Sequence, residues 1–343
     1  MMCILGKAKI LHLKTRLKKF ITGLTVPQEY CCLGLEDFQN PLSVFLTDRD
    51  NDFALDVTGS HLFLGYKPLI IGLSLTSDST DYLKIREQSN VCLSFGKSPF
   101  KNDKTWRGFQ TDQTSPARLL LRKISEKVLD KNVVLFYEGE FGDHSFLSPF
   151  HQFTNRQRRK LLKDAPNNVA LPGNLVDQVR IAYAVPRLIS IVTISDGILM
   201  NMFPTDLHGA SGQKGYLSSL RIGGMASRQV ETYKRIVISE VDSLSYNSSY
   251  ALGKNHMASL KDEKLFSLHH ERSAFFDFPL PSFALSYREM NMIDSFDHGI
   301  HRIYLYEVVN HTSVRQSNTL AHIHQYYAQW RIDQGIPTQL FFR

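Results

Sequence analysis

The sequence predicts a mainly β fold with some helices. Its 343 residues include 22 Phe and 14 Tyr, and short Val, Ile and Leu runs recur along the chain. Aromatic and β-branched residues are enriched in strands. Asp196-Gly197, between two apolar runs, is typical of a tight hairpin turn. Hydrophobic residues make up 43% of the chain and charged residues 21%, which suits a globular protein with a sizeable core.

The length fits about two domains, since a domain usually has about 100–200 residues. A basic run followed by the turn-rich stretch DAPNNVALPG, residues 164–173, marks the best boundary between them. We therefore expect four segments: a basic amphipathic extension at 1–24, a β-rich domain at 25–153, a basic linker at 154–173 and a second β-rich domain at 174–343.

In the first half, charged turns separate short apolar runs that are typical of strands. The expected elements are strands at 42–46, 53–57, 61–64 and 69–75, a short helical stretch around Leu119–Leu129 and a strand at Val133–Tyr137.

The second half has a lead-in helix at Val176–Ala184 and a closing helix at Asn318–Trp330, whose apolar residues recur at helical spacing. The strands expected between them are 188–194, 198–203, 215–222, 235–241, 275–278 and 303–309. Each half carries a late Gly-x-His, Gly142-Asp143-His144 and Gly299-Ile300-His301. An internal duplication is therefore one reading of the chain, and two unrelated halves are the other.

Charge and composition restrict the partners. Six cations precede the first acidic residue, Glu29, and apolar residues recur among them at helical spacing. This segment fits a docked or frayed helix, a start placed too far upstream, or a transit or membrane-surface helix. The net charge of +7 has one local run, between Arg156 and Lys163, which a solvated helix face explains without nucleic acid. No apolar run reaches the roughly 20 residues of a membrane span.

Several kinds of site are excluded by spacing. Gly96-Lys97-Ser98 lacks the earlier glycine of a P-loop, because Val91 stands there. No dinucleotide-binding glycine fingerprint follows a strand, and no Gly-x-Ser-x-Gly elbow occurs. His322 and His324 would point to different faces of a helix, so we expect no metal site. Four cysteines without a regular framework indicate a reducing, cytoplasmic location.

Several motifs of the second half occur in the order found in one family. They are the proline-led hairpin VPRLISIVTISDGILMN (residues 185–201), the loop at 202–209, the strand Tyr216–Arg221, the turn Ala226–Arg228, and Asp297–Val308 with its Gly-x-His and Glu-Val. Over residues 180–330 the chain resembles the flavin reductase-like FMN-binding split-barrel family. The resemblance implies a split β-barrel in the C-terminal half and leaves the N-terminal half as a β-rich unit, or a degenerate barrel.

Two positions depart from the family pattern. Ile300 replaces the Asp of Gly-Asp-His, and Tyr306 replaces the last glycine of Gly-Glu-Val. These changes put the handling of nicotinamide in more doubt than the binding of flavin. The N-terminal half resembles the family only through Lys67–Gly72 and Gly142–His144.

The resemblance implies FMN as cofactor, NAD(P)H as a co-substrate, and a site built from three groups of residues. The hairpin exit would hold the ring through Asn201, Met202, Phe203, Pro204 and Thr205, which offer amide, apolar and hydroxyl surface. Arg221, Ser227 and Arg228 would hold the phosphate, since guanidinium groups suit phosphate oxygens. His301 would line the space where nicotinamide stacks. Each group also has a structural alternative. The hairpin exit could be an ordinary loop, the arginines could be surface cations, and His301 could be a strand histidine held by Asp297.

Two functions follow from the resemblance. The first is a cytoplasmic flavoprotein oxidoreductase that transfers hydride from NAD(P)H to a flavin, a transfer for which the cofactor carries the chemistry. The second is a non-catalytic flavin- or haem-binding split barrel. The partners of the chain would be flavin and nicotinamide small molecules. Members of the family usually pair two barrels, and here the pair would form as a homodimer or as an internal pseudo-dimer.

Overall fold

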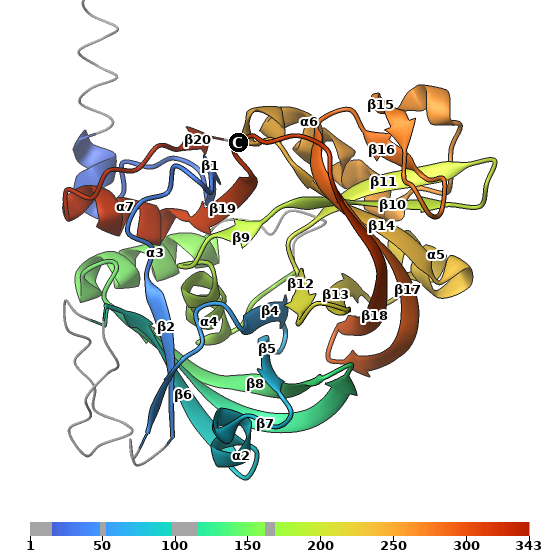
Figure 1. Ribbon diagram of the computed structural model, residues 1–343. Helices are drawn as coiled ribbons and strands as arrows, with labels where there is room; N and C mark the ends of the chain where they lie inside the picture. Colours follow the sequence, from blue (N-terminus) through green and yellow to red (C-terminus); the bar gives the residue numbers. More distant parts are fainter. Residues whose placement is uncertain (1–15, 49–52, 98–114, 162–168, 343) are drawn as a thin grey trace, which may run out of the picture.

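The structure is a computed structural model that describes residues 16–48, 53–97, 115–161 and 169–342. It is mainly β, as predicted, and two seven-stranded sheets dominate it (Figure 1). Residues 16–22 are helical, and the part of the basic extension before residue 16 lies outside the described residues. None of the described helices is both long enough and apolar enough to span a membrane.

The N-terminal sheet has the strand order β3-β2-β6-β7-β8-β5-β4. Its strands are β2 (Ser43–Asp48), β3 (Ala54–Asp56), β4 (His61–Gly65), β5 (Ile70–Thr76), β6 (Asn90–Gly96), β7 (Ala117–Leu129) and β8 (Asn132–His144). One helix, α2 (Thr80–Ile85), connects β5 to β6. The helical stretch expected around Leu119–Leu129 is wrong, because these residues form the central strand β7. Three consecutive leucines, buried on both faces of a sheet, have no period that separates strand from helix.

The C-terminal sheet has the order β11-β10-β14-β17-β18-β13-β12. Its strands are β10 (Ser190–Ser195), β11 (Met200–Thr205), β12 (His208–Ser211), β13 (Gly215–Arg221), β14 (Arg235–Val241), β17 (Ala284–His298) and β18 (His301–Ser313). Helix α5 (Met225–Tyr233) connects β13 to β14, as α2 connects β5 to β6. Both sheets therefore follow one topology, strand for strand, and both are open, because their first and last strands do not pair with each other.

The shared topology places the two Gly-x-His motifs at different positions. Gly299 and Ile300 form the turn between β17 and β18, whereas Gly142 lies inside β8, paired with Leu119. The turn of the N-terminal half that corresponds to Gly299 is Asp130-Lys131. The likeness drawn between the two motifs is therefore wrong, although the two sheets repeat one another.

The remaining elements cover the sheets and connect them. These are β1 (Tyr30–Gly34), α3 (Pro149–Leu161), α4 (Leu175–Ala182), β9 (Arg187–Leu188), η1 (Ser243–Ser245), α6 (Tyr246–Ala251), η2 (Leu252–Met257), η3 (Glu263–Leu265), β15 (Leu268–Arg272), β16 (Pro279–Pro281), β19 (Leu320–His324), α7 (Gln325–Asp333) and β20 (Phe341–Phe342). The order β20-β1-β19-β9 joins both ends of the chain in a small third sheet.

Two of these elements correct the expected secondary structure. The closing helix predicted at Asn318–Trp330 begins only at Gln325, because residues 320–324 form β19 between β1 and β9. The side chain of His324 accepts a hydrogen bond from the Tyr326 N–H and caps α7. The strand expected at 275–278 is a turn that leads into β16. The lead-in helix at 176–184 is confirmed as α4.

The two large sheets pack against each other through a shared core. Leu62, Phe136 and Leu129 of the N-terminal half lie in one buried cluster with Leu217 and Ile303 of the C-terminal half. Polar contacts surround this cluster. Ser74 Oγ lies 2.8 Å from Ser211 Oγ, and Lys127 Nζ lies 2.9 Å from Asp294 Oδ2. Together these contacts hold the two halves as one folded unit.

Candidate functional site

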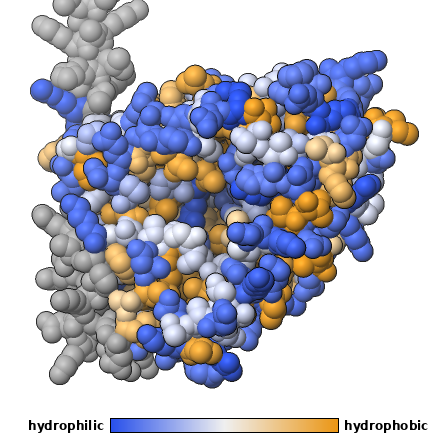
Figure 2. Space-filling view, viewed as in Figure 1, coloured by the Kyte–Doolittle hydropathy of each residue, from blue (hydrophilic) through white to orange (hydrophobic). Residues whose placement is uncertain are grey.

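A cavity of about 2000 Å³ lies where the two halves meet. The space-filling view shows the surface hollowed near its centre, between the two sheets (Figure 2). Residues of the N-terminal half, of α3 and α4, and of the C-terminal sheet all line the cavity. Ligand sites usually measure about 300–1,000 Å³, so this cavity has room for more than one small molecule.

The C-terminal half supplies one wall through two strand ends. Pro204, Thr205 and Asp206 leave β11, and Arg221 ends β13 beside them. Because β13 pairs with β18, Arg221 lies opposite His301 in the register of the sheet. The end of the hairpin and the turn after Arg221 thus line a single cavity.

The turn after β13 presents a free helix N-terminus to this cavity. Gly223, Gly224, Ala226 and Ser227 line it, and Gly224 is the N-cap of α5 with no side-chain cap bond. The first N–H groups of a helix have no partner within the helix, and they attract anions. In the corresponding helix α2, the Ser79 side chain caps the N-terminus by accepting from the Tyr82 N–H. The helix of the C-terminal half is therefore the one left open for a ligand.

His301 lies at the junction of the two halves. Its ring packs edge-on against Tyr66, with centroids 4.7 Å apart, and its Nδ1 lies 3.2 Å from Ser219 Oγ. Its Nε2 is buried and has no hydrogen-bond partner among the described residues. Burial, with the nearby Arg221 charge, lowers the pKa of His301 to about 4, so the ring is neutral at pH 7.

The hairpin turn before His301 requires glycine for two reasons. Gly299 has a φ of +60°, which L side chains rarely adopt. A Cβ at this position would also collide with the Lys67 carbonyl oxygen and the Pro68 ring of the N-terminal half. The Gly-x-His motif thus sets the close approach that brings His301 to Tyr66.

A half-buried carboxylate forms the base of the same wall. Asp206 Oδ2 accepts hydrogen bonds from the Tyr183 hydroxyl at 2.6 Å and from His322 Nε2 at 2.8 Å. Burial raises the pKa of Asp206, but the hydrogen bonds from His322 and Tyr183 outweigh it and lower the pKa to about 2. Asp206 is therefore ionised at neutral pH, and its Oδ1 accepts no hydrogen bond from the described residues.

Aromatic rings surround this carboxylate. Tyr30 packs against Tyr183 with centroids 4.9 Å apart and stacks on His322 at 5.2 Å. His322 also lies 3.2 Å from the Tyr250 hydroxyl through its Nδ1. Each polar end of the His322 ring is therefore engaged.

Four of the predicted site residues lie away from the cavity wall. Asn201 is fully buried and donates from Nδ2 to Gln229 Oε1 at 2.8 Å and to the Asn255 carbonyl. Met202 and Phe203 belong to the hydrophobic cores beneath the C-terminal sheet. Arg228 donates to the Gly223 carbonyl and does not line the cavity. The geometry brings Pro204, Thr205, Arg221, Ser227 and His301 together and leaves the other four outside.

Ser227 has partners of its own. Its hydroxyl lies 2.7 Å from the Tyr304 hydroxyl and 3.1 Å from Glu231 Oε1. Its side chain therefore fixes the first turn of α5 against β18, and its backbone N–H is the group left for a ligand. Asp297, expected as an alternative partner of His301, pairs instead with Arg302.

Sequence reasoning missed Asp206, Tyr30, Tyr66 and His322. Asp206 directly follows Thr205 in the predicted loop, so its position gave a usable signal. Tyr30, Tyr66 and His322 come from distant segments that only the paired sheets bring together. For metals, the one group of three candidate ligands among the described residues is His269, His270 and Glu271, on the outer strand β15.

The chain matches no protein-family model, and it matches no curated protein sequence. Solved structures similar to it include the NADH:FAD oxidoreductase SgcE6 of Streptomyces globisporus C-1027, at 12% identity and a TM-score of 0.39, covering 47% of this chain and 96% of that one. The flavin reductase component BorF of a bacterial tryptophan halogenase has 13% identity and a TM-score of 0.39, covering 43% and 92%. An FMN-binding protein from Thermus thermophilus has 14% identity and a TM-score of 0.36, covering 45% and 82%.

Proposed function

We propose that the cavity between the two halves binds FMN and that the chain is a flavin-dependent oxidoreductase that accepts hydride from NAD(P)H. The observation that carries this proposal is the convergence, on one cavity, of the β11 exit, the arginine-bearing turn with an open helix N-terminus, and His301. A flat ring with a phosphate tail needs these three features.

The phosphate would lie at the start of α5. Arg221 is exposed and forms no ion pair with any described residue, so its guanidinium is available to an anion. The free N–H groups after Gly224 add donors, and Gly223 and Gly224 carry no side chain that would block the backbone. The helix dipole further favours negative charge at this end.

The ring would lie against Pro204–Leu207 and Tyr66. Leu207 and the Pro204 ring offer apolar surface, and Asp206 Oδ1 offers an acceptor to a ring N–H. Because Tyr183 and His322 hold Oδ2, the carboxylate has a fixed direction. Such prior orientation of a polar group is what a ligand site requires.

The flavin, when bound, supplies the redox chemistry: NAD(P)H loses two electrons and a proton as hydride, and the flavin is reduced. The chain's own residues position the rings and exclude water. His301, neutral and buried, places no charge beside them. No protein acid is needed for a transfer between stacked rings.

We further propose that one chain contains both members of the barrel pair, so that the site is complete in a monomer. The repeated strand order and the core shared by the two sheets support this proposal. So does Tyr66, which the N-terminal half contributes to the site in the C-terminal half. The N-terminal half, with its capped α2, would then act as the structural partner.

The visible spectrum of the purified chain with added FMN tests the proposal, followed by flavin-dependent oxidation of NADH and NADPH. We expect quenching of FMN fluorescence and NAD(P)H oxidation that His301→Ala slows. Flavin binding without oxidation, and without a response to His301→Ala, would indicate the non-catalytic binding function. A haem spectrum, or no flavin binding, would contradict the proposal.

A further inference from the structure

Helix α3 brings a second group of cations to the cavity. Arg158, Arg159 and Lys160, in its last turn, all line the cavity and are exposed. We call these three residues the α3 cations. Arg156, one turn earlier, is paired with Asp177 at 3.2 Å, and Arg180 shares the same carboxylate. The α3 cations, in contrast, form no ion pair with any described residue.

Their charge acts on the interior of the cavity. Burial raises the pKa of Tyr30 and of Tyr326, and the Arg159 charge partly offsets both increases. Burial lowers the pKa of His324, and the charges of Arg180 and Arg159 lower it further. The Arg159 charge thus acts on three aromatic residues that line the cavity or lie next to it. This is expected of a cation that faces into the cavity.

The α3 cations are separate from the cations near α5. Figure 1 shows α3 and α5 on opposite sides of the molecule, with α4, β12 and β13 between them. The cavity wall carries eight Lys or Arg side chains and four Asp or Glu, and two of the cations share Asp177. The cavity therefore has two cationic ends, and a single FMN phosphate can occupy only one of them.

We propose that the α3 cations bind the pyrophosphate of a second, dinucleotide ligand, which enters the same cavity. This inference rests on the proposed function, because the hydride donor of that reaction is a nicotinamide dinucleotide with a pyrophosphate. A volume of about 2000 Å³ accommodates a flavin and part of a dinucleotide. Guanidinium groups bind phosphate oxygens in bidentate pairs, and the pyrophosphate of a dinucleotide carries two negative charges, which three unpaired cations can neutralise.

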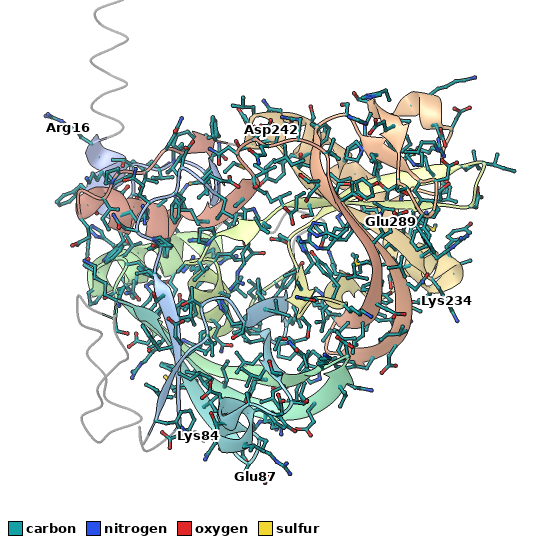
Figure 3. All side chains as sticks on the ribbon, viewed as in Figure 1. Arg16, Lys84, Glu87, Lys234, Asp242 and Glu289 are labelled. Atoms are coloured by element: carbon teal, nitrogen blue, oxygen red, sulfur yellow. The ribbon has the colours of Figure 1, made fainter. Side chains whose placement is uncertain are left out.

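Calorimetric titration of the full chain with ADP, which carries the pyrophosphate but no flavin or nicotinamide, tests this inference. The test variant is R158Q/R159Q/K160Q. The control K84Q/K234Q/K264Q removes the same charge from side chains that do not line the cavity; Lys84 and Lys234 lie at the periphery (Figure 3). All six side chains are exposed, so neither variant should unfold.

We expect the wild type and the control to bind ADP alike, with affinity that falls as salt rises. The α3 variant should bind at least about tenfold more weakly, which corresponds to one charged hydrogen bond lost. With NADH, the same variant should raise KM and leave kcat unchanged, as expected for a contact made equally in ground and transition states. FMN affinity, measured separately by fluorescence, should not change.

Equal ADP binding by the wild type and the α3 variant would overturn the inference, as would equal weakening by the control. The outcome is independent of the flavin proposal. ADP binding that needs the α3 cations, in a chain that does not bind FMN, would support this inference and reject the flavin. FMN binding without ADP binding would reject this inference alone.

Discussion

The rings of His301 and Tyr66 meet edge-on at 4.7 Å, and one comes from each half of the chain. This contact exists because the hairpin at Gly299 approaches Lys67 and Pro68 closely. The site of the C-terminal half therefore includes a wall that the N-terminal half builds.

Replacing Tyr66 tests whether that wall touches the flavin. We expect Tyr66→Ala to weaken FMN binding by about three- to tenfold, because an aromatic contact contributes about 0.5–1.5 kcal/mol. Tyr66→Phe keeps the ring and should bind FMN as the wild type does. Fluorescence titration measures both. Unchanged affinity in Tyr66→Ala would place the flavin elsewhere.

The two arginines of the β13–α5 turn should differ in their effects. Arg221 lines the cavity, whereas Arg228 donates to the Gly223 carbonyl outside it. Arg221→Gln should weaken FMN binding about tenfold to a hundredfold, since a hydrogen bond to a charged group contributes about 1.5–3 kcal/mol. Arg228→Gln should have no effect.

Riboflavin, which lacks the phosphate, provides the control for this prediction. Its affinity should be the same for the wild type and Arg221→Gln. If both arginine variants bind FMN normally, or if riboflavin binding also falls, the phosphate does not lie at the start of α5.

The Asp206 carboxylate should stabilise the fold as well as orient a ligand. Asp206→Asn weakens two hydrogen bonds to a half-buried charge, so we expect the free energy of unfolding to fall by about 2 kcal/mol at pH 7. The matched control is Asp297→Asn, whose exposed pair with Arg302 should contribute less than about 1 kcal/mol. Urea unfolding measures both. Equal losses in the two variants would contradict the assigned role of Asp206.

Much of the architecture could be predicted from local patterns, and the assembly of the site could not. Asp196-Gly197 predicts the position of the β10–β11 hairpin correctly, because turn residues have a local signature, although the connection contains four residues, 196–199. Leu119–Leu129 is a strand and not the expected helix, because Leu119–Leu121 are buried on both faces and show no period. Residues 320–324 form a strand because β1, from the other end of the chain, and β9 pair with them.

The same distinction holds for the site residues. Arg221 and His301 lie on the paired strands β13 and β18, and motif order pointed to both of them. Thr205 ends β11 at the opposite edge of the sheet, and it lines the same cavity. Side chains alternate along β11. Asn201 donates to the Gln229 amide, whereas Met202 and Phe203 belong to two different hydrophobic cores. No sequence pattern showed where the cavity wall begins along that strand. Tyr30 and Tyr66 could not be predicted as site residues, because only the pairing of the two halves brings them to the cavity.

Stability should fall in mild acid because His61 and His301, which are buried, and His208, which is half-buried, are neutral in the folded chain. Burial lowers the pKa of His61 to about 3, that of His208 to about 4, and that of His301 to about 4. The unfolded chain protonates these groups near pH 6.5, whereas the folded chain does so only below about 4. The stability is therefore complete above pH 6.5 and decreases toward pH 4, at up to about 4 kcal/mol per pH unit for three protons.

Urea unfolding between pH 7.5 and 4.5 measures this slope. His208→Gln should reduce it by about one third, and His270→Gln, on the exposed strand β15, should leave it unchanged. A free energy of unfolding that stays constant from pH 7 to pH 5 would show that these histidines are not buried as described.

The most direct test of the account is a stoichiometric titration with FMN at a protein concentration far above the dissociation constant. Helix α5 of the C-terminal half has an open N-terminus, and Arg221 ends the strand before it. In the N-terminal half, Ser79 caps α2, and the strand before it ends at Thr76, which carries no charge. We therefore predict that fluorescence quenching ends at one FMN per chain in a monomer. No quenching, or an end point at two FMN per chain, would contradict a single flavin site formed between unequal halves.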